Sequence, residues 1–353
     1  MDAYKAFFLE FLIAVTLLSA AIIAFNIYID PLWYFGGNRF SGINYSFNGR
    51  ESKLNLYLKS PGHYDCIVFG ASAETLLDAS LIKNHACFNF SFNAGNVLDF
   101  IDYAKYIKSL GAKPSLIVVG VDFYDFREKK LKSEAPDAVK NFTSPPSPLK
   151  LYFSWDALFL SYRTVRGDAP MPHNFDSNFK GIVLYDKIQP NWRETVDKGY
   201  TIFYNTSSPV TADNLKYYEE LRQIFPQATY IGYVPHVSAK VMAKIKFAGQ
   251  LDPLLDVIYR VSKLFDRFYD FSVPSKTTID SPDTYDGYHF TPDITRQVAE
   301  EINGNTTGAC LDLQRETFEE YKNEYNRRLD DYIESHHFSA ASFPSDKENL
   351  GKK

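Results

Sequence analysis

The sequence predicts an α/β fold, built from βαβ units around a parallel sheet, that follows an N-terminal membrane helix. Three strand-like segments at 66–69, 86–92 and 116–119 are separated by segments with helical spacing, as in βαβ units. The first and third are continuously apolar, which is typical of strands buried on both faces. A long apolar run at 6–29 opens the chain.

Composition excludes several classes of protein. The 353 residues are too many for one small module and allow one large domain with insertions or two modest domains. Hydrophobic residues make up 45% and charged residues 23%, so the chain is not disordered throughout. A formal net charge of -5 gives a nucleic-acid partner no electrostatic support. None of the three cysteines stands in a CxxC pair, so we expect neither a zinc ribbon nor a disulfide framework.

The apolar run at 6–29 is long enough to cross about 30 Å of hydrocarbon as a helix. A signal peptide cleaved near 19–21 and a buried core helix are the alternatives. Because the run continues beyond that candidate cleavage site, we favour an uncleaved single-pass anchor over 1–30 in the cell membrane. The aromatic residues at 33–35 are typical of an interfacial belt, and the flanking basic residues orient the helix only weakly.

Each element of the first half is justified by its pattern. Residues 40–60 form a polar connecting segment. The strand at 66–69 ends at Gly70, a helix is expected over 73–82, and 86–92 is the second strand. Asn96 is a plausible N-cap for the next helix, which Gly111 ends before the third strand at 116–119.

The alternation of predicted strands and helices is interrupted at 127–210 and resumes at 212. Residues 127–210 show no clear period and hold many aromatic residues, so we interpret them as an insertion that serves as a lid or binding surface. The sequence then predicts, in order, a helix over 212–225, a strand at 230–234, a helix over 253–265, a strand at 268–271, a helix opened by Thr291 and Pro292, a charged helix over 311–335 and a flexible tail. The predicted domains are an anchor (1–30), an α/β domain with an insertion (31–310), and a charged helix with its tail (311–353).

Polar side chains stand at the carboxyl ends of the predicted strands, where open parallel sheets bind ligands. In chain order they are Ser72, then Gly95 and Asn96, then Asp122, then His236, and last Asp286 and His289. Ser72 lies at a strand-to-helix turn, where a hydroxyl is exposed and backbone N–H groups face an oxyanion. A serine needs a base to take its proton, so His289 is the candidate base and Asp286 the group that orients it.

Each residue also has a structural interpretation. A lone Ser after a Gly is usually a helix cap, and a DxxH in a loop is common by chance. Asp122 can cap the segment that follows it, and His236 can either face the pocket or cap a helix, which we favour slightly. Together, in this order at strand ends, the residues favour a Ser-His-Asp site.

The order of these blocks resembles the SGNH (GDSL-like) hydrolase superfamily. That family places a Ser after the first strand, a Gly after the second, an Asn after the third, and Asp-x-x-His near the end. The positions that match are Ser72, Gly95, Asp122 and the pair Asp286 and His289, and the resemblance covers about 64–125 and 273–302. It implies a flavodoxin-like three-layer α/β/α sandwich.

Within the superfamily, the anchor, the Ile29-Asp30-Pro31 exit and the segment DCIVFGASAE (65–74) are most similar to membrane-anchored cell-envelope members. These include the alginate O-acetylation proteins and the D-alanyl transfer protein of teichoic acids. Such proteins often work beside a membrane-bound O-acyltransferase. The resemblance therefore implies that partner, an acylated polysaccharide substrate and an extracytoplasmic catalytic domain.

Two positions depart from the family pattern. The turn reads Gly-Ala-Ser-Ala, where small residues still fit. More seriously, Asp122 stands where the family has an Asn that donates to the oxyanion, and a bare carboxylate there repels negative charge. We therefore expect the oxyanion hole to rest on the backbone N–H groups of Ser72 and Gly95, aided by the amide of Asn96. Losing one such donor costs about 10²–10³ in rate.

The leading hypothesis is a membrane-anchored serine acyltransferase or esterase that acts on O-acyl groups of a cell-envelope polysaccharide through an acyl-Ser72 intermediate. A catalytically silent adaptor that binds glycan or an O-acyltransferase is the alternative, and a lipase-like enzyme is weaker. Trp155 and Trp192 are candidates for a glycan platform, although ordinary packing is the favoured explanation of both residues. No P-loop, GxGxxG or HExxH motif is present, so we expect no cofactor.

Overall fold

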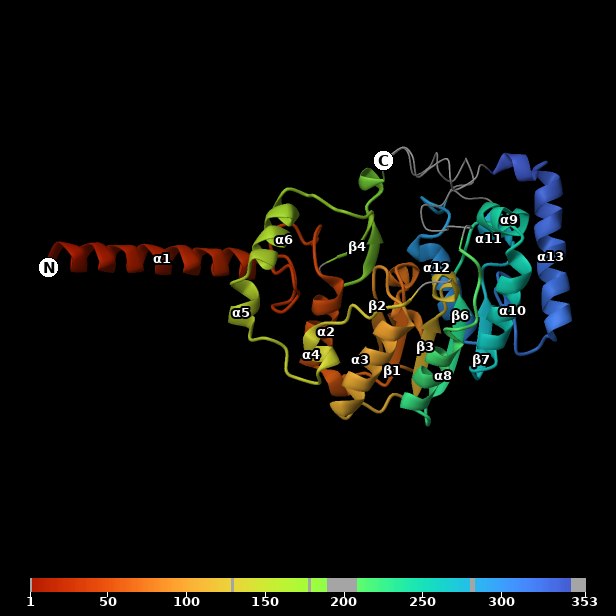
Figure 1. Ribbon diagram of the computed structural model, residues 1–353, viewed down its shortest axis with the longest axis horizontal. Coiled ribbons are helices and arrows are strands. Elements are labelled where there is room, and N and C mark those ends of the chain that lie inside the picture. The colour runs from red at the N-terminus through yellow and green to blue at the C-terminus, as the bar shows by residue number, and fades with distance from the viewer. Residues whose placement is uncertain (1, 128–129, 177–178, 189–207, 280–282, 344–353) are drawn as a thin grey trace. The chain divides into compact units, whose positions relative to one another are not determined.

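The computed structural model describes residues 2–127, 130–176, 179–188, 208–279 and 283–343 (Figure 1). The chain divides into two compact units. Unit 1 combines Met1–Lys59 with Pro136–Lys187, and unit 2 combines Ser60–Ala135 with Ile188–Lys353. The predicted insertion at 127–210 therefore contributes most of its described residues to the unit that also contains the N-terminal helix. Trp192 and the end of the predicted tail, 344–353, lie outside the described residues.

Unit 1 begins with α1 (Asp2–Ile29), an apolar helix long enough to cross a membrane. Its side chains are exposed over most of its length, and full burial begins at Asn26. The aromatic belt predicted at 33–35 is wrong for Trp33, which is only 1% exposed. The Trp33 ring packs edge-on against the rings of Phe47 and Phe179, so it belongs to the core of unit 1.

The rest of unit 1 consists of short elements. They are α2 (Gly49–Lys59), α4 (Asp137–Lys140), α5 (Pro148–Tyr152), α6 (Trp155–Val165), the antiparallel pair β4 (His173–Phe175) and β5 (Gly181–Val183), and η5 (Tyr185–Lys187). Ser147 and Ser154 cap α5 and α6 by accepting hydrogen bonds from backbone N–H groups.

Unit 2 is an α/β unit around a six-stranded sheet with the strand order β2-β1-β3-β6-β7-β8. The strands are β1 (Cys66–Gly70), β2 (Cys87–Ser91), β3 (Leu116–Gly120), β6 (Thr229–Val234), β7 (Arg267–Asp270) and β8 (Leu311–Asp312). All pairs are parallel except β7 with β8, which is antiparallel. The five parallel strands lie close to the predicted ones, because their apolar runs are buried on both faces.

Most helices of unit 2 connect these strands, and α13 follows the last of them (Figure 1). They are α3 (Val97–Ser109), α8 (Leu215–Ile224), α9 (Ala239–Phe247), α10 (Leu251–Ser262), α11 (Lys276–Ile279), α12 (Pro292–Ile302) and α13 (Phe318–Ser335), with short 3₁₀ turns η1 (Pro61–His63), η2 (Ala73–Leu76), η3 (Ala79–Leu81), η4 (Phe123–Phe126) and η6 (Ala340–Ser342). Asn96 caps α3 as expected, in a capping box with Asp99.

Two predicted helices are wrong in part. The helix expected over 73–82 is two 3₁₀ turns, because the backbone at Leu77 is extended and Asp78 starts a new turn by capping Ser80. The helix expected over 311–335 begins only at Phe318, where Thr317 and Glu320 form a capping box. The residues before it pair with β7 as the edge strand β8.

The structure also contains a disulfide that the sequence analysis did not expect. Cys66 and Cys87 stand opposite each other in the register of β1 and β2, and their sulfur atoms are bonded. Spacing along the chain carries no signal for this bond, because only the sheet register brings the two cysteines together. The expectation of no disulfide framework therefore left out this one bond, and Cys310 is the free cysteine.

Candidate active site

The turn after β1 presents the hydroxyl of Ser72. Ser72 is the N-cap residue of η2, but its side chain makes no capping hydrogen bond. Its Oγ atom lies 2.8 Å from Nε2 of His289, and the side chain is half-buried rather than enclosed. This distance falls within the roughly 2.6–3.2 Å expected of a nucleophile and its base. The capping interpretation of Ser72 is therefore excluded for its side chain.

His289 is held by the carboxylate of Asp286. Its Nδ1 atom lies 2.6 Å from Oδ2 of Asp286, and both residues are buried. The second oxygen, Oδ1, accepts hydrogen bonds from the backbone N–H groups of Tyr288 (3.0 Å) and His289 (2.8 Å). An ionised carboxylate accepts only, so Nδ1 carries the ring proton and Nε2 is left to accept from Ser72.

The imidazole is also fixed by two rings that the sequence analysis did not single out. The ring of Tyr285 lies parallel to it, with 5.4 Å between centroids and 4° between planes. The ring of Tyr288 meets it edge-on at 5.2 Å. Two tyrosines within the four residues before the candidate base are the signal in the sequence that could have identified these contacts.

Asp122 does not present a bare carboxylate. Its Oδ2 atom accepts a hydrogen bond from the hydroxyl of Tyr288, and Oδ1 accepts from the N–H of Tyr124 at 2.9 Å. Burial raises the pKa of Asp122, although these two hydrogen bonds oppose the rise. Asp122 therefore caps η4, and Tyr288 ties it to the loop that carries His289.

The expected oxyanion hole is not assembled as predicted. The N–H of Gly95 donates to the carbonyl of Phe92 at 2.9 Å. The amide of Asn96 donates to the carbonyl of Lys132 at 3.0 Å, and its oxygen caps α3. Within the described part of the chain, only the N–H of Ser72 among the three expected donors has no acceptor. A Cβ at Gly95 would come within 2.9 Å of the carbonyl oxygen of Gly70, so the glycine serves close packing here.

Glu74 is a buried residue at the site that the sequence analysis missed. Its Oε2 atom accepts from the N–H of Ala71 at 2.7 Å, which closes the turn that carries Ser72. Its Oε1 atom has no hydrogen-bond partner among the described residues. Burial, with the nearby charge of Asp122, raises the pKa of Glu74 to about 8, so its carboxyl group is mostly neutral at pH 7.

Two glycines make room for this carboxyl group. A Cβ at Gly70 would lie 2.3 Å from Cγ of Glu74, and a Cβ at Gly120 would lie 2.3 Å from its Cδ. Adjacent strands β1 and β3 thus both end in glycine where the Glu74 side chain folds back. A glycine at the end of each of two neighbouring strands, with a Glu close by in sequence, is the signal that could have identified Glu74.

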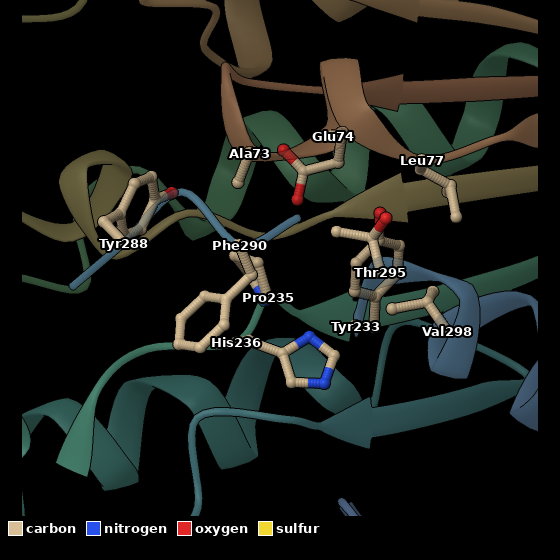
Figure 2. A pocket seen from close by; sticks show the side chains of 10 residues that line it. All are labelled: Ala73, Glu74, Leu77, Tyr233, Pro235, His236, Tyr288, Phe290, Thr295 and Val298. Carbon is tan, nitrogen blue, oxygen red and sulfur yellow. The ribbon is translucent and has the colours of Figure 1, made fainter. Parts of the chain in front are cut away.

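His236 does not line the same space as the Ser72 hydroxyl. It lines a small pocket together with Glu74 and with Tyr288 and Phe290, the neighbours of His289 (Figure 2). Its Nε2 atom lies 3.2 Å from Oε1 of Gln297, and burial lowers its pKa to about 4. Ser238, not His236, is the N-cap residue of α9, so the favoured capping interpretation is wrong. The pocket has room for about one water molecule.

A fourth carboxyl group, that of Asp125, is buried three residues after Asp122. Its Oδ2 atom accepts from the N–H of Val97 at 3.0 Å and from the hydroxyl of Tyr218 at 2.8 Å. Burial and the charge of Asp122 raise the pKa of Asp125 to about 7. The described residues contain no cluster of side chains suited to bind a metal ion.

No protein-family model, curated protein or solved structure matches this chain. The chemistry must therefore be argued from the residues themselves. A half-buried serine hydroxyl, an imidazole whose Nε2 meets that hydroxyl and a buried carboxylate on Nδ1 are the parts of a nucleophile, a general base and its orienting group.

Proposed function

We propose that this chain is a serine-dependent ester hydrolase or O-acyltransferase. The observation that carries the proposal is the continuous hydrogen-bonded series from Ser72 through His289 to Asp286. The three residues come from two loops far apart in sequence. Packing alone does not require a half-buried hydroxyl to meet an imidazole oriented in this way.

In the proposed reaction, Oγ of Ser72 attacks the ester carbonyl as Nε2 of His289 takes its proton. Asp286 stabilises the imidazolium that forms, and the N–H of Ser72 faces the developing oxyanion. His289 returns the proton to the departing alcohol, which leaves an acyl-Ser72. Water or a sugar hydroxyl then attacks this ester, His289 takes the new nucleophile's proton, and the serine hydroxyl is restored.

The strand order supports the proposed family. Without the antiparallel edge strand β8, the order β2-β1-β3-β6-β7 is the 2-1-3-4-5 order of flavodoxin-like sheets. Ser72 follows β1, Asp122 follows β3 and the Asp-x-x-His pair follows β7, in agreement with the resemblance to SGNH hydrolases. We therefore propose an SGNH-like α/β/α sandwich for unit 2.

The disulfide supports an extracytoplasmic location for unit 2. Disulfides persist in oxidising compartments and are rare in the cytoplasm. With α1 as anchor, this location favours acylated polysaccharide of the cell envelope as substrate and a membrane-bound O-acyltransferase as partner. The chain is isolated from cells and denatured in the presence of an alkylating agent that traps free thiols. We expect one alkylated thiol, that of Cys310, and two more only after reduction. Three free thiols before reduction would contradict the location.

A fluorophosphonate probe tests the chemistry directly. We expect it to label the wild-type chain and not Ser72→Ala, and Asp286→Asn should label much more slowly because His289 loses its orienting group. Ser80→Ala is the matched control, since Ser80 is an exposed serine eight residues away whose hydroxyl bonds only to Asp78. Equal labelling of wild type and Ser72→Ala would contradict the proposal.

The silent adaptor remains a second candidate for one specific reason. Gly95 and Asn96 use their N–H groups on protein acceptors, so the site offers an oxyanion fewer donors than expected. The same probe separates the two functions. A folded wild-type chain that is not labelled would favour the adaptor.

A further inference from the structure

Unit 1 carries a cluster of exposed aromatic and aliphatic side chains that the proposed chemistry does not use. We call it the aromatic surface, and it consists of Leu149, Phe153, Trp155, Phe159 and Tyr162. Trp155 is 80% exposed, and every other member is more than half exposed. Single exposed apolar residues need no explanation, but several large ones gathered on neighbouring elements mark a contact surface.

Helix spacing concentrates these side chains on one side of α6. Trp155, Phe159 and Tyr162 stand at positions i, i+4 and i+7, so they share a face. The opposite face, with Ala157, Ser161 and Thr164 at the same spacing, is the buried one. The large rings of this helix thus face outward, while its small residues pack inward. No described residue covers this face, so it is suited to an apolar environment outside the described part of the chain.

The two helices that carry the aromatic surface contact the C-terminal end of α1. Helix α1 contacts both α5 and α6, which lie beside its C-terminal end (Figure 1). Nδ2 of Asn26 donates to the carbonyl of Tyr152, the last residue of α5, at 2.8 Å. The ring of Phe35 packs edge-on against the ring of Tyr152 at 5.2 Å. These contacts all lie within unit 1, so the position of α5 and α6 along α1 is defined.

That position places α5 and α6 at the boundary of a bilayer that α1 crosses. About 20 helical residues cross the hydrocarbon at 1.5 Å per residue. Counted from Ala3 or Phe7, this length ends between residues 22 and 26, where α1 meets α5 through Asn26. Side chains that project outward from α5 and α6 at this level meet lipid headgroups and the outer part of the acyl chains.

The charges on this surface are consistent with a headgroup environment. Lys150, Arg163 and Arg166 stand among the aromatic residues, together with Asp156 and Asp168. The guanidinium of Arg163 lies 5.6 Å from the centroid of the Phe159 ring, and that of Arg166 lies 5.8 Å from the Tyr162 ring. Rings interleaved with arginines are typical of elements that lie in the membrane interface.

We propose that the aromatic surface of α5 and α6 lies in the phospholipid interface beside α1, so that unit 1 is held on the membrane by two contacts. The inserted rings then fix the tilt and rotation of unit 1, which a single helix does not do. This inference rests on the insertion of α1 and not on the chemistry of Ser72. It also assigns Trp155 to lipid rather than to a glycan platform.

Depth-dependent fluorescence quenching tests the proposal on the full chain in phosphatidylcholine nanodiscs. The discs contain lipid brominated either near the glycerol end or near the methyl end of the acyl chain. The difference between wild type and Trp155→Phe isolates the Trp155 emission, because Trp33 and Trp192 are present in both chains. We expect the shallow bromines to remove most of this difference signal and the deep bromines to remove less.

A second variant shows whether the Trp155→Phe substitution changes the emission only through a local change in structure. Leu149→Trp in the Trp155→Phe background should restore the quenchable signal, because position 149 is on the same surface. A difference signal that neither brominated lipid reduces would overturn the proposal. So would emission of Trp155 that responds to soluble acylated polysaccharide while remaining unquenched by lipid. Recovery of the chain in the nanodiscs separately reports insertion of α1.

Discussion

The two units each bury a carboxyl group beside a reversal of the chain, but they surround it differently. In unit 1, Asp30 follows α1 and accepts from the N–H groups of Tyr34 (2.9 Å), Phe35 (2.9 Å) and Gly37 (2.6 Å) and from the hydroxyl of Tyr152. In unit 2, Glu74 accepts from one N–H group, and its other oxygen has no partner among the described residues.

Asp30 has a purely structural role, whereas Glu74 closes the turn at the proposed site with a charge that depends on pH near neutrality. The side chain of Asp30 accepts from four donors, which is how a carboxyl group of this kind is satisfied when buried. These bonds hold the chain reversal that follows α1 in one conformation. Glu74 instead closes the Ser72 turn as a mostly neutral acid, because burial raises its pKa to about 8.

The largest effect is expected from Asp30→Ala. It leaves three backbone N–H groups and the Tyr152 hydroxyl buried without their acceptor, so we expect a loss of about 3–5 kcal/mol in the free energy of unfolding. Denaturant titration of the full chain in detergent, followed by the emission of buried Trp33, measures it. Asp30→Asn keeps the shape and one acceptor oxygen and should lose less. Equal losses for the two variants would mean that the acceptor oxygen kept by Asn contributes nothing, which would contradict this prediction.

Glu74→Gln tests the other half of the comparison through pH. The pKa of Glu74 is about 8 in the folded chain and about 4.5 when unfolded, so the folded state retains a proton that the unfolded state has released. The wild-type chain therefore loses stability as the pH rises from about 4.5 to about 8. Glutamine cannot ionise, so the free energy of unfolding of the variant should rise relative to that of the wild type across this pH range. The relative increase should be on the order of 2–4 kcal/mol at about pH 8.

Denaturant unfolding of both chains at about pH 5 and about pH 8 measures this gain. The titration of His236, whose pKa is lowered to about 4, is present in both chains and cancels in the difference. Parallel pH profiles would show that Glu74 is already ionised in the folded chain.

Gly120→Ala tests the space that holds Glu74. The added Cβ would lie 2.3 Å from Cδ of Glu74, so we expect a loss of about 1–3 kcal/mol from overpacking. The loss should shrink in a Glu74→Ala background, where the space is empty, and a double-mutant cycle measures this coupling. Gly62→Ala is the control, since nothing lies within 4 Å of its added Cβ. An unchanged loss in the double variant would contradict the steric explanation.

The smallest effect is expected from Tyr152→Phe. It removes one of the four donors to Asp30 and leaves the three N–H groups in place, so we expect a loss of about 1 kcal/mol. The same unfolding measurement as for Asp30→Ala applies. A loss as large as that of Asp30→Ala would mean that the hydroxyl, and not the set of amides, holds the carboxylate.

Local patterns in the sequence predicted the parallel strands of unit 2 and the long apolar helix. A strand buried on both faces and a helix of membrane length each appear as an uninterrupted apolar run of characteristic length. Ser72, Asp286 and His289 could be singled out because strand ends and a short DxxH spacing are readable along the chain. The two 3₁₀ turns at 73–81 were missed because the side chains of Glu74 and Asp78 accept local hydrogen bonds from Ala71 and Ser80. The Glu74 side chain that makes the first of these bonds also packs against Gly120 of β3, and this contact is not visible in the sequence.

The sequence by itself determined which residues could supply a nucleophile, a base and a membrane helix, because residue chemistry and hydrophobic periodicity are local. Only the tertiary structure decided that His289 reaches Ser72 across 217 positions of the chain, that Cys66 meets Cys87, and that Trp33 is buried while Trp155 is exposed. Such pairings depend on sheet register and on which surfaces pack together, and no window of neighbouring residues encodes either.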